Sequence, residues 1–151
     1  MHRPYCLPIW CATILLVAAA TGARAQVDPK ALLQKQFETL ARGDVAGALA
    51  LYTDDAVVDG AGLCAAAPCV GKAAIQKELE NRIAHKVQAT GLNYYVSGNV
   101  VTTRYAVHSD STQQAGVDRI IGWEIIELKA GKIGSAAALR HEPAAGFECR
   151  E

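Results

Sequence analysis

The stretch that decides the fold reads ARGDVAGALALYTDDAV and covers residues 41–57. Gly43 is a residue type that ends helices, and the following Asp44 is a residue type that caps the start of a new one. Apolar side chains then recur at helical spacing, at Val45, Ala48, Leu49 and Tyr52. Residues 56–59, which begin with the apolar run Ala-Val-Val and end at Asp59, predict a short strand. The stretch therefore predicts a passage from helices into a sheet.

Helices are expected on both sides of this stretch. An Asp-Pro pair at positions 28–29 supplies an N-cap and a first helical residue, which predicts a helix that runs to about Ala41. Residues 72–86 carry apolar residues on one helical face and predict a third helix. Glu78 and Arg82 are four residues apart on that helix, so they are expected to form an ion pair along it.

The apolar period changes from helical to alternating after residue 86, which indicates strands. Strands are expected over residues 87–96, 100–109, 117–128 and 132–140, with turns at 97–99 and 129–131 and a polar loop at 110–116. No repeat or linker divides the chain. We therefore expect one α+β domain over residues 26–141, with helices first and an antiparallel meander after, and an irregular tail over residues 142–151.

The first 25 residues have the three regions of a secretory signal. His2 and Arg3 precede an apolar run at residues 9–20, and an A-R-A cleavage motif ends at Ala25. The run is too short to span a membrane, and no cysteine follows the cleavage site to indicate a lipoprotein anchor. We expect a bacterial chain that begins at Gln26, in the periplasm or outside the cell, without a membrane anchor.

Charge and composition narrow the classes of partner. The whole chain has 15 basic and 15 acidic residues, and 51% of its residues are hydrophobic. A chain of this composition is not expected to be disordered. Removal of residues 1–25 would take away Arg3 and Arg24, which leaves 13 basic against 15 acidic residues. Nucleic acid is therefore not an expected partner, because that binding favours a basic surplus.

Cysteine chemistry is expected in the segment before the third helix. Cys64 and Cys69 lie in a Gly, Ala, Cys and Pro-rich loop that is expected to run to Gly71. An oxidising compartment favours a disulfide between them, and the alternative is two unpaired thiols. Two ligands without a nearby Cys/His pair are poor evidence for zinc. The pairing state of Cys149 in the tail stays open.

The order of elements resembles the nuclear-transport-factor-2-like superfamily, particularly its SnoaL-like branch. The residues that carry the resemblance are the quoted stretch at 41–57, VGKAAI at 70–75 and EIIELKAGKI at 124–133. The resemblance covers residues 31–140. It implies a curved antiparallel sheet wrapped on three helices of the N-terminal half into a cone, with an apolar pocket at the open end and dimerisation through the sheet. This fold hosts isomerases, cyclases, epoxide hydrolases, dehydratases and binding proteins, so it implies the fold more strongly than the activity.

The resemblance carries over known catalytic sets only in part. Ketosteroid isomerases of this superfamily place an oxyanion-donating tyrosine where this chain has Gln36 and a protonated acid where it has Glu124. Their catalytic base falls at Gly60, one residue from Asp59. The bridging arginine and two aspartates of limonene-type epoxide hydrolases fall at Arg104, Ala106 and Ala138. Neither set is complete.

Strand parity supplies the remaining polar candidates. Glu124 shares a strand face with Ile120, Gly122 and Ile126, so its carboxyl is expected to be buried, with a partner or a raised pKa. Arg104 and His108 share the face of the preceding strand that the resemblance makes the pocket face. We interpret the three as a cluster in which Glu124 or His108 is an acid or base and Arg104 orients an oxygen. The alternative is a cross-strand ion pair of Glu124 and Arg104, with His108 in solvent.

Two functions of different class fit these observations. The first is an exported protein that binds a small, mainly apolar molecule in the cone pocket, as a monomer or a homodimer. The second is a cofactor-free isomerase, cyclase or dehydratase that uses Glu124 or His108. The sequence has no Gly-rich phosphate loop, HExxH motif or nucleophile elbow, so no cofactor or metal is expected. The faces taken by Asp59 and by the Tyr94-Tyr95 pair stay open.

Overall fold

The structure is a computed structural model that describes residues 27–60 and 63–143, apart from the side chains of residues 65 and 140–143. The expected signal segment, most of the expected tail, and Cys149 lie outside the described residues. The helices are α1 (Pro29–Ala41), α2 (Val45–Leu49), α3 (Gly71–Ala84) and α4 (Asp110–Gln114). The strands are β1 (Tyr52–Gly60), β2 (Cys64–Val70), β3 (Gln88–Ser97), β4 (Val100–His108), β5 (Ile120–Lys129) and β6 (Lys132–Pro143).

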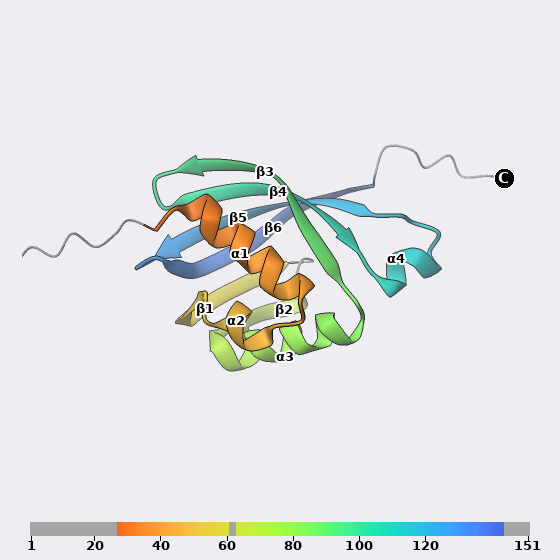
Figure 1. The fold of residues 1–151 in the computed structure, drawn as a ribbon, viewed down its shortest axis with the longest axis horizontal. Helices are drawn as coiled ribbons and strands as arrows, with labels where there is room; N and C mark the ends of the chain where they lie inside the picture. Colours follow the sequence, from red (N-terminus) through yellow and green to blue (C-terminus); the bar gives the residue numbers. More distant parts are fainter. Residues whose placement is uncertain (1–26, 61–62, 144–151) are drawn as a thin grey trace, which may run out of the picture.

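The six strands form one curved, unclosed sheet in the order β2-β1-β6-β5-β4-β3. The strands β3 to β6 make the predicted antiparallel meander, and β1 joins it by pairing parallel to β6. The helices α1, α2 and α3 lie together on one side of the sheet (Figure 1). The predicted α+β class and the arrangement of a curved sheet wrapped on three helices are confirmed.

Local signals account for the first two helices. The Asp28 carboxylate accepts a hydrogen bond from the Lys30 backbone N–H at 3.0 Å, and Pro29 follows as the first helical residue. The Asp44 carboxylate caps α2 in the same way, accepting from Gly47 N–H at 2.8 Å. Gly43 lies between the two helices at φ +69°, a backbone conformation that glycine adopts readily. The caps predicted at positions 28 and 44 are confirmed.

Five features of the secondary structure differ from the prediction. Tyr52 begins β1 instead of ending α2, and the expected loop before α3 contains strand β2. The expected polar loop contains α4, because Ser109 and Thr112 form a capping box there. The expected strand over residues 117–128 begins only at Ile120. Finally, β6 continues to Pro143, three residues beyond residue 140, where the last strand was expected to end.

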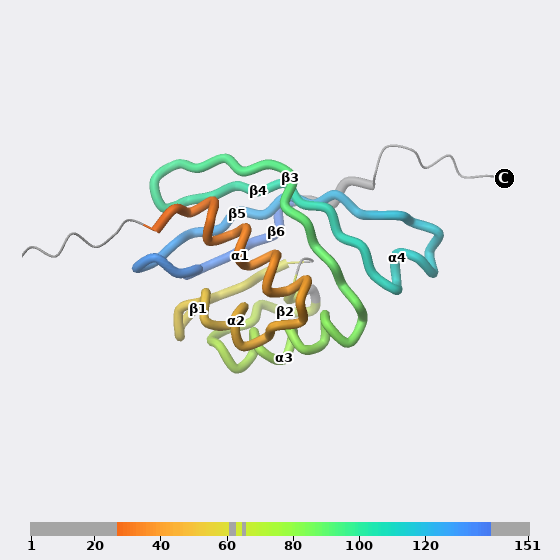
Figure 2. The backbone as a smooth tube through the Cα atoms, in the orientation of Figure 1, coloured from red at the N-terminus to blue at the C-terminus, as the bar shows by residue number. Residues whose placement is uncertain are grey.

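The strand β3 bends where its pairing with β4 shifts register, between Gly91 and Asn93. Figure 2 shows the bend as β3 passes from the end of α3 across the molecule toward α1. A β-bulge of this kind increases the local bend and twist of a sheet. A side chain at Gly91 would collide with the Tyr94 hydroxyl and the Phe37 ring, so a larger residue at this bend would require both rings to shift. The bend brings β3 over α1 and curves the sheet around the core.

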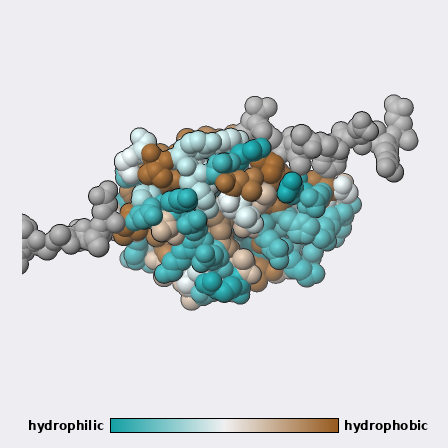
Figure 3. Space-filling view, turned by 45° about the horizontal axis from the view of Figure 1, so that its top comes forward, coloured by the Kyte–Doolittle hydropathy of each residue, from teal (hydrophilic) through white to brown (hydrophobic). Residues whose placement is uncertain are grey.

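The core lies between the sheet and the three helices. Its largest fully buried side chains come from α1, α3 and the strands; they are Tyr52, Leu33, Ile75, Leu79, Ile126, Ile133, Val58, Val101, Thr39 and Thr103. On the surface shown in Figure 3, apolar side chains gather in separate patches over the upper part, and polar side chains cover the end that carries α4. Within the described part of the chain, no helix is long and apolar enough to cross a membrane.

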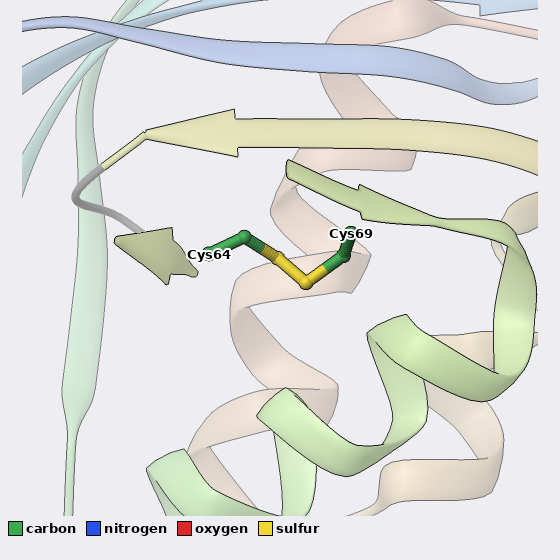
Figure 4. The surroundings of a disulfide bond; sticks show 2 residues. All are labelled: Cys64 and Cys69. Carbon is green, nitrogen blue, oxygen red and sulfur yellow. A yellow bond between two sulfur atoms is a disulfide. The ribbon is translucent and has the colours of Figure 1, made fainter. Parts of the chain in front are cut away.

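The structure joins Cys64 to Cys69 by a disulfide, with the two Cα atoms 5.8 Å apart. Figure 4 shows the bond lying between the two ends of β2, beside α3. Both cysteines are buried, at 2% and 7% exposure. The pairing expected from the sequence is therefore present, but it closes a strand at the edge of the sheet instead of an irregular loop.

Candidate functional site

An enclosed cavity lies between the helices and the inner face of the sheet. Its space open to the centres of water molecules is about 20 Å³, which is room for about one water. Apolar walls come from Phe37, Leu40, Leu63 and Ala89, and polar groups from Gln36, Tyr52, Arg82, Tyr105 and Glu124. Five polar side chains on five different elements therefore converge on one small space.

Glu124 is the acid of the cavity. It lies on β5 with Gly122 and Ile126, which are both buried on the same face, and the cross-strand neighbour of Glu124 on β4 is the buried Thr103. Burial raises the pKa of the Glu124 carboxyl to about 7, and the positive charge of Arg82 offsets only part of this effect. No hydrogen bond joins the carboxyl to another described side chain or backbone group. At neutral pH the carboxyl therefore exists in both protonation states.

Arg82 brings the only guanidinium among the residues that line this cavity. Burial lowers its pKa, while Glu124, Tyr52 and Tyr105 raise it through their charges. The expected ion pair with Glu78 does not form, because Arg82 lies on the buried side of α3 with Ile75 and Leu79. The spacing of residues 75, 79 and 82 is that of one helical face, and this signal could have placed Arg82 inward from the sequence.

Two tyrosines complete the surroundings of Glu124. Burial and the charge of Glu124 raise the pKa of Tyr52, and the same two causes raise the pKa of Tyr105 to about 12. The Gln36 amide donates from Nε2 to the Tyr52 hydroxyl at 2.6 Å. The Gln36 side chain is 6% exposed, and its Oε1 has no hydrogen-bond partner in the structure. The tyrosines are neutral at physiological pH, so charge in the cavity comes from Arg82 and Glu124.

The expected cluster of Glu124, Arg104 and His108 does not form. In the β4–β5 pairing Glu124 faces Thr103, whereas Arg104 faces Trp123. Directly paired residues lie on the same face of a sheet, so Arg104 projects from the outer face, where its guanidinium lies 6.0 Å from the Trp123 ring centroid. The expected cross-strand ion pair of Glu124 and Arg104 is absent for the same reason. The prediction took the wrong face of β4 as the pocket face, and a one-residue shift exchanges the two faces.

His108 lies at the end of β4, away from the cavity. Its Nδ1 is 2.7 Å from the Asp118 carbonyl oxygen and its Nε2 is 2.8 Å from Gln113 Nε2. These contacts tie the strand end to the segment around α4. The histidine therefore has a local partner on each ring nitrogen instead of a role beside Glu124.

The faces that the sequence left open are now assigned. Asp59 is exposed and pairs with the exposed Ala137 of β6, so it projects from the outer face. Tyr94 packs against the core, and Tyr95 is 57% exposed. Asp59, next to the position of the ketosteroid isomerase base, therefore does not line the cavity. Glu124 is the single acid among the residues that line it.

A surface groove adjoins the cavity between α1 and β3. The space in it open to water centres is about 260 Å³, and Phe37 and Ala89 line both the groove and the cavity. Phe37 is partly exposed and therefore stands as a wall between the two. In the part of the chain that the structure describes, no group of three or more His, Cys, Asp or Glu residues could hold a metal ion.

The sequence matches a model of the SnoaL-like domain over residues 33–135, which is more than half of the chain. The chain belongs to the SnoaL-like domain family. No curated protein matches it. This SnoaL-like domain has the inner sheet face, the enclosed cavity and the convergent polar residues described above, but a combination of side chains that matches neither of the two catalytic sets compared with it.

Solved structures share the fold at low sequence identity. An NTF2-like protein of unknown function from Cytophaga hutchinsonii is 15% identical, with a TM-score of 0.63 over 80% of this chain and 95% of its own. The epoxide hydrolase/cyclase-like enzyme SalBIII, of pyran ring formation in the polyether salinomycin, is 17% identical, with a TM-score of 0.62 over 74% and 88%. RV0760c from Mycobacterium tuberculosis, solved with estradiol-17beta-hemisuccinate, is 20% identical, with a TM-score of 0.60 over 74% and 92%. Such likeness extends to the fold alone.

Proposed function

We propose that the protein is exported and binds a small, mainly apolar molecule in the cavity beside Glu124. The observation that carries this proposal is that Gln36 Oε1 is buried in this cavity without a hydrogen-bond partner, beside the Glu124 carboxyl, which no described hydrogen bond reaches. Buried polar groups are nearly always hydrogen-bonded, to protein or to water. A water molecule or a polar atom of a ligand would complete both groups.

Access to the cavity runs past Phe37 in this proposal. The cavity itself has room for about one water, so anything larger needs the adjoining groove. A ligand would place its polar tip beside Glu124 and its apolar body between α1 and β3. The ligand-bound RV0760c and the enzyme SalBIII support the proposal as precedents for small-molecule sites on this fold. Export is supported by the signal-like residues 1–25 and by the disulfide between Cys64 and Cys69.

Native mass spectrometry of the protein purified from its own cells tests both parts of the proposal. We expect a chain that begins at Gln26 and carries a bound small molecule that is lost on denaturation. An Ala89→Trp variant, whose new side chain would fill the cavity and its mouth, should be isolated without the molecule. An Ala46→Trp variant, changed at an exposed position of α2, should retain it. A bare, uncleaved wild-type chain would contradict both parts.

A second candidate function is cofactor-free proton transfer by Glu124. It is favoured by the Glu124 pKa of about 7, because a general acid or base works best when its pKa lies near the working pH. We expect the wild type to accelerate hydrogen–deuterium exchange at the α-carbon of cyclohexanone, followed by NMR. Glu124→Gln should abolish the acceleration, and Glu127→Gln, at an exposed position of the same strand, should retain it. Equal exchange by wild type and Glu124→Gln would exclude Glu124 as the base.

We further propose that two copies associate through the outer face of the sheet. Exposed Tyr95 and Ile125 lie on this face, and the Tyr95 ring stacks on Trp123 with centroids 6.1 Å apart. Contiguous exposed apolar surface of this kind marks interaction sites. We expect a dimer in analytical ultracentrifugation that Ile125→Lys converts to a monomer. Val27→Lys, at an exposed apolar position beside the Gly131 turn, should remain dimeric; a wild type that is monomeric at all concentrations would refute the proposal.

A further inference from the structure

The cavity holds a cation, Arg82, that forms no salt bridge with a carboxylate of the described residues. Arg82 lines the cavity from the buried side of α3, and its nearest acid in the site is Glu124 on β5. The attraction between the two acts through space. In the described ranges 27–60 and 63–143, no salt bridge or hydrogen bond joins the guanidinium to a carboxylate. A guanidinium presents five N–H donors, and it prefers planar oxygen pairs such as those of a carboxylate.

Glu124 neutralises the charge of Arg82 only when the Glu124 carboxyl is ionised. The groups that face Glu124 are Arg82 from α3, Tyr52 from β1 and Tyr105 from β4, and Arg82 is the only cation among them. Protonated Glu124 leaves the cavity with one net positive charge, whereas ionised Glu124 leaves it neutral. Two carboxylates that share one enclosed site repel each other, so one of them takes up a proton.

The Gln36 side chain is a further group of the cavity that could bind an acidic ligand. Its amide is more than nine-tenths buried, contacts the Tyr52 hydroxyl, and leaves its second polar atom without a partner. Turned by half a rotation, the amide would accept from Tyr52 and offer its N–H₂ group to the cavity. Donors would then come from Arg82, Gln36 and a protonated Glu124.

We propose that the ligand of this cavity is a small apolar acid whose carboxylate binds the Arg82 guanidinium, and that Glu124 takes up one proton from solvent as the ligand binds. The inference rests on the proposed binding function and deepens it by naming the chemical class of the ligand. In this step, the protein with ionised Glu124 binds one ligand anion and takes up one proton. The apolar body of the acid lies in the groove between α1 and β3, past Phe37.

Calorimetric titration with 2-naphthoate and its neutral isostere 2-naphthamide tests the proposal. At pH 6 we expect the naphthoate to bind about 10- to 100-fold more tightly than the amide, the range for hydrogen bonds to a buried charge. Its affinity should fall about tenfold from pH 6 to pH 8, because Glu124 is mostly ionised at the higher pH. At pH 8, titrations in buffers of different ionisation enthalpy should show uptake of close to one proton.

Variants assign the two roles separately. Arg82→Met should lose the preference for naphthoate, whereas Arg82→Lys, which keeps the charge, should retain part of it. Glu124→Gln should bind naphthoate without proton uptake and with an affinity that is equal at pH 6 and pH 8. Arg42→Met, changed at an exposed arginine after α1, should behave as wild type. Circular dichroism checks that each variant is folded.

The outcomes separate this inference from the function on which it rests. If the amide binds as tightly as the naphthoate, or if binding takes up no proton at pH 8, the acidic-ligand inference is overturned and the binding function stands. If neither compound binds, the inference is overturned as well, and a bare chain in native mass spectrometry would remove the binding function with it. If Arg82→Met does not fold, Arg82→Lys and Glu124→Gln still give the preference and the proton count.

Discussion

Replacement of Glu124 by glutamine is expected to stabilise the protein by about 3 kcal/mol at pH 8 and to leave its stability nearly unchanged at pH 4. The folded-state pKa of Glu124 is raised from 4.5 to about 7 by burial. The folded protein therefore binds more protons than the unfolded chain between these two pKa values. The stability that protonated Glu124 contributes is fully present below pH 4.5. It falls as the pH rises toward 7 and no longer changes well above that pH. Glutamine cannot ionise, so it avoids this loss.

Urea unfolding of both proteins at pH 4, 6 and 8 measures the effect. Other groups titrate as well, and the exposed Asp54 and Asp55 carboxylates have pKa values lowered by Lys72 and Lys129. These contributions are the same in wild type and variant, so the difference between the two curves isolates Glu124. Glu127→Gln, at an exposed position of β5, should show no such difference. Equal stability of wild type and Glu124→Gln at pH 8 would mean that the carboxylate is well solvated in the folded state.

Much of the fold could be predicted because its signals are local. The caps at Asp28 and Asp44 and the change of apolar period after residue 86 each act within a few residues. The strand β2 was missed because its sequence, CAAAPCV, contains neither the β-branched run nor the aromatic residues that mark strands. It pairs only with β1 at the edge of the sheet, where proline is tolerated.

The candidate site could be predicted only where the pattern within a residue's own strand or helix determines which face its side chain takes. The parity of β5 was enough to place Glu124 toward the core. The partners of Glu124 depend on the register between β4 and β5, which no local pattern encodes, and so Arg104 was assigned to the wrong face. The same register places Tyr105 on the inner face of β4, together with the buried Val101 and Thr103. Arg82 was missed because a charged residue four positions after a glutamate was interpreted as part of an exposed pair.

Reduction of the Cys64–Cys69 bond is expected to lower the free energy of unfolding by roughly 2 kcal/mol, because the bond limits the freedom of the six-residue segment in the unfolded chain. Urea unfolding with and without a reductant measures this loss, in a Cys149→Ser background that prevents thiol exchange with the tail. A Cys64→Ala, Cys69→Ala double variant should match the reduced protein and be insensitive to the reductant. Identical unfolding curves for oxidised and reduced protein would show that the bond contributes no stability.

The same bond also holds one wall of the cavity. Leu63 is 8% exposed, lines the cavity and immediately precedes Cys64, while Cys69 pairs with Val58 of β1. The disulfide therefore fixes the chain beside Leu63 to the edge of the sheet. We expect reduction to weaken 2-naphthoate binding at pH 6 as well as to lower stability. Helix α3, which carries Arg82, begins directly after β2, so loosening of β2 should also disturb Arg82. A protein that lost stability on reduction but kept its full affinity would place the ligand away from the Leu63 wall.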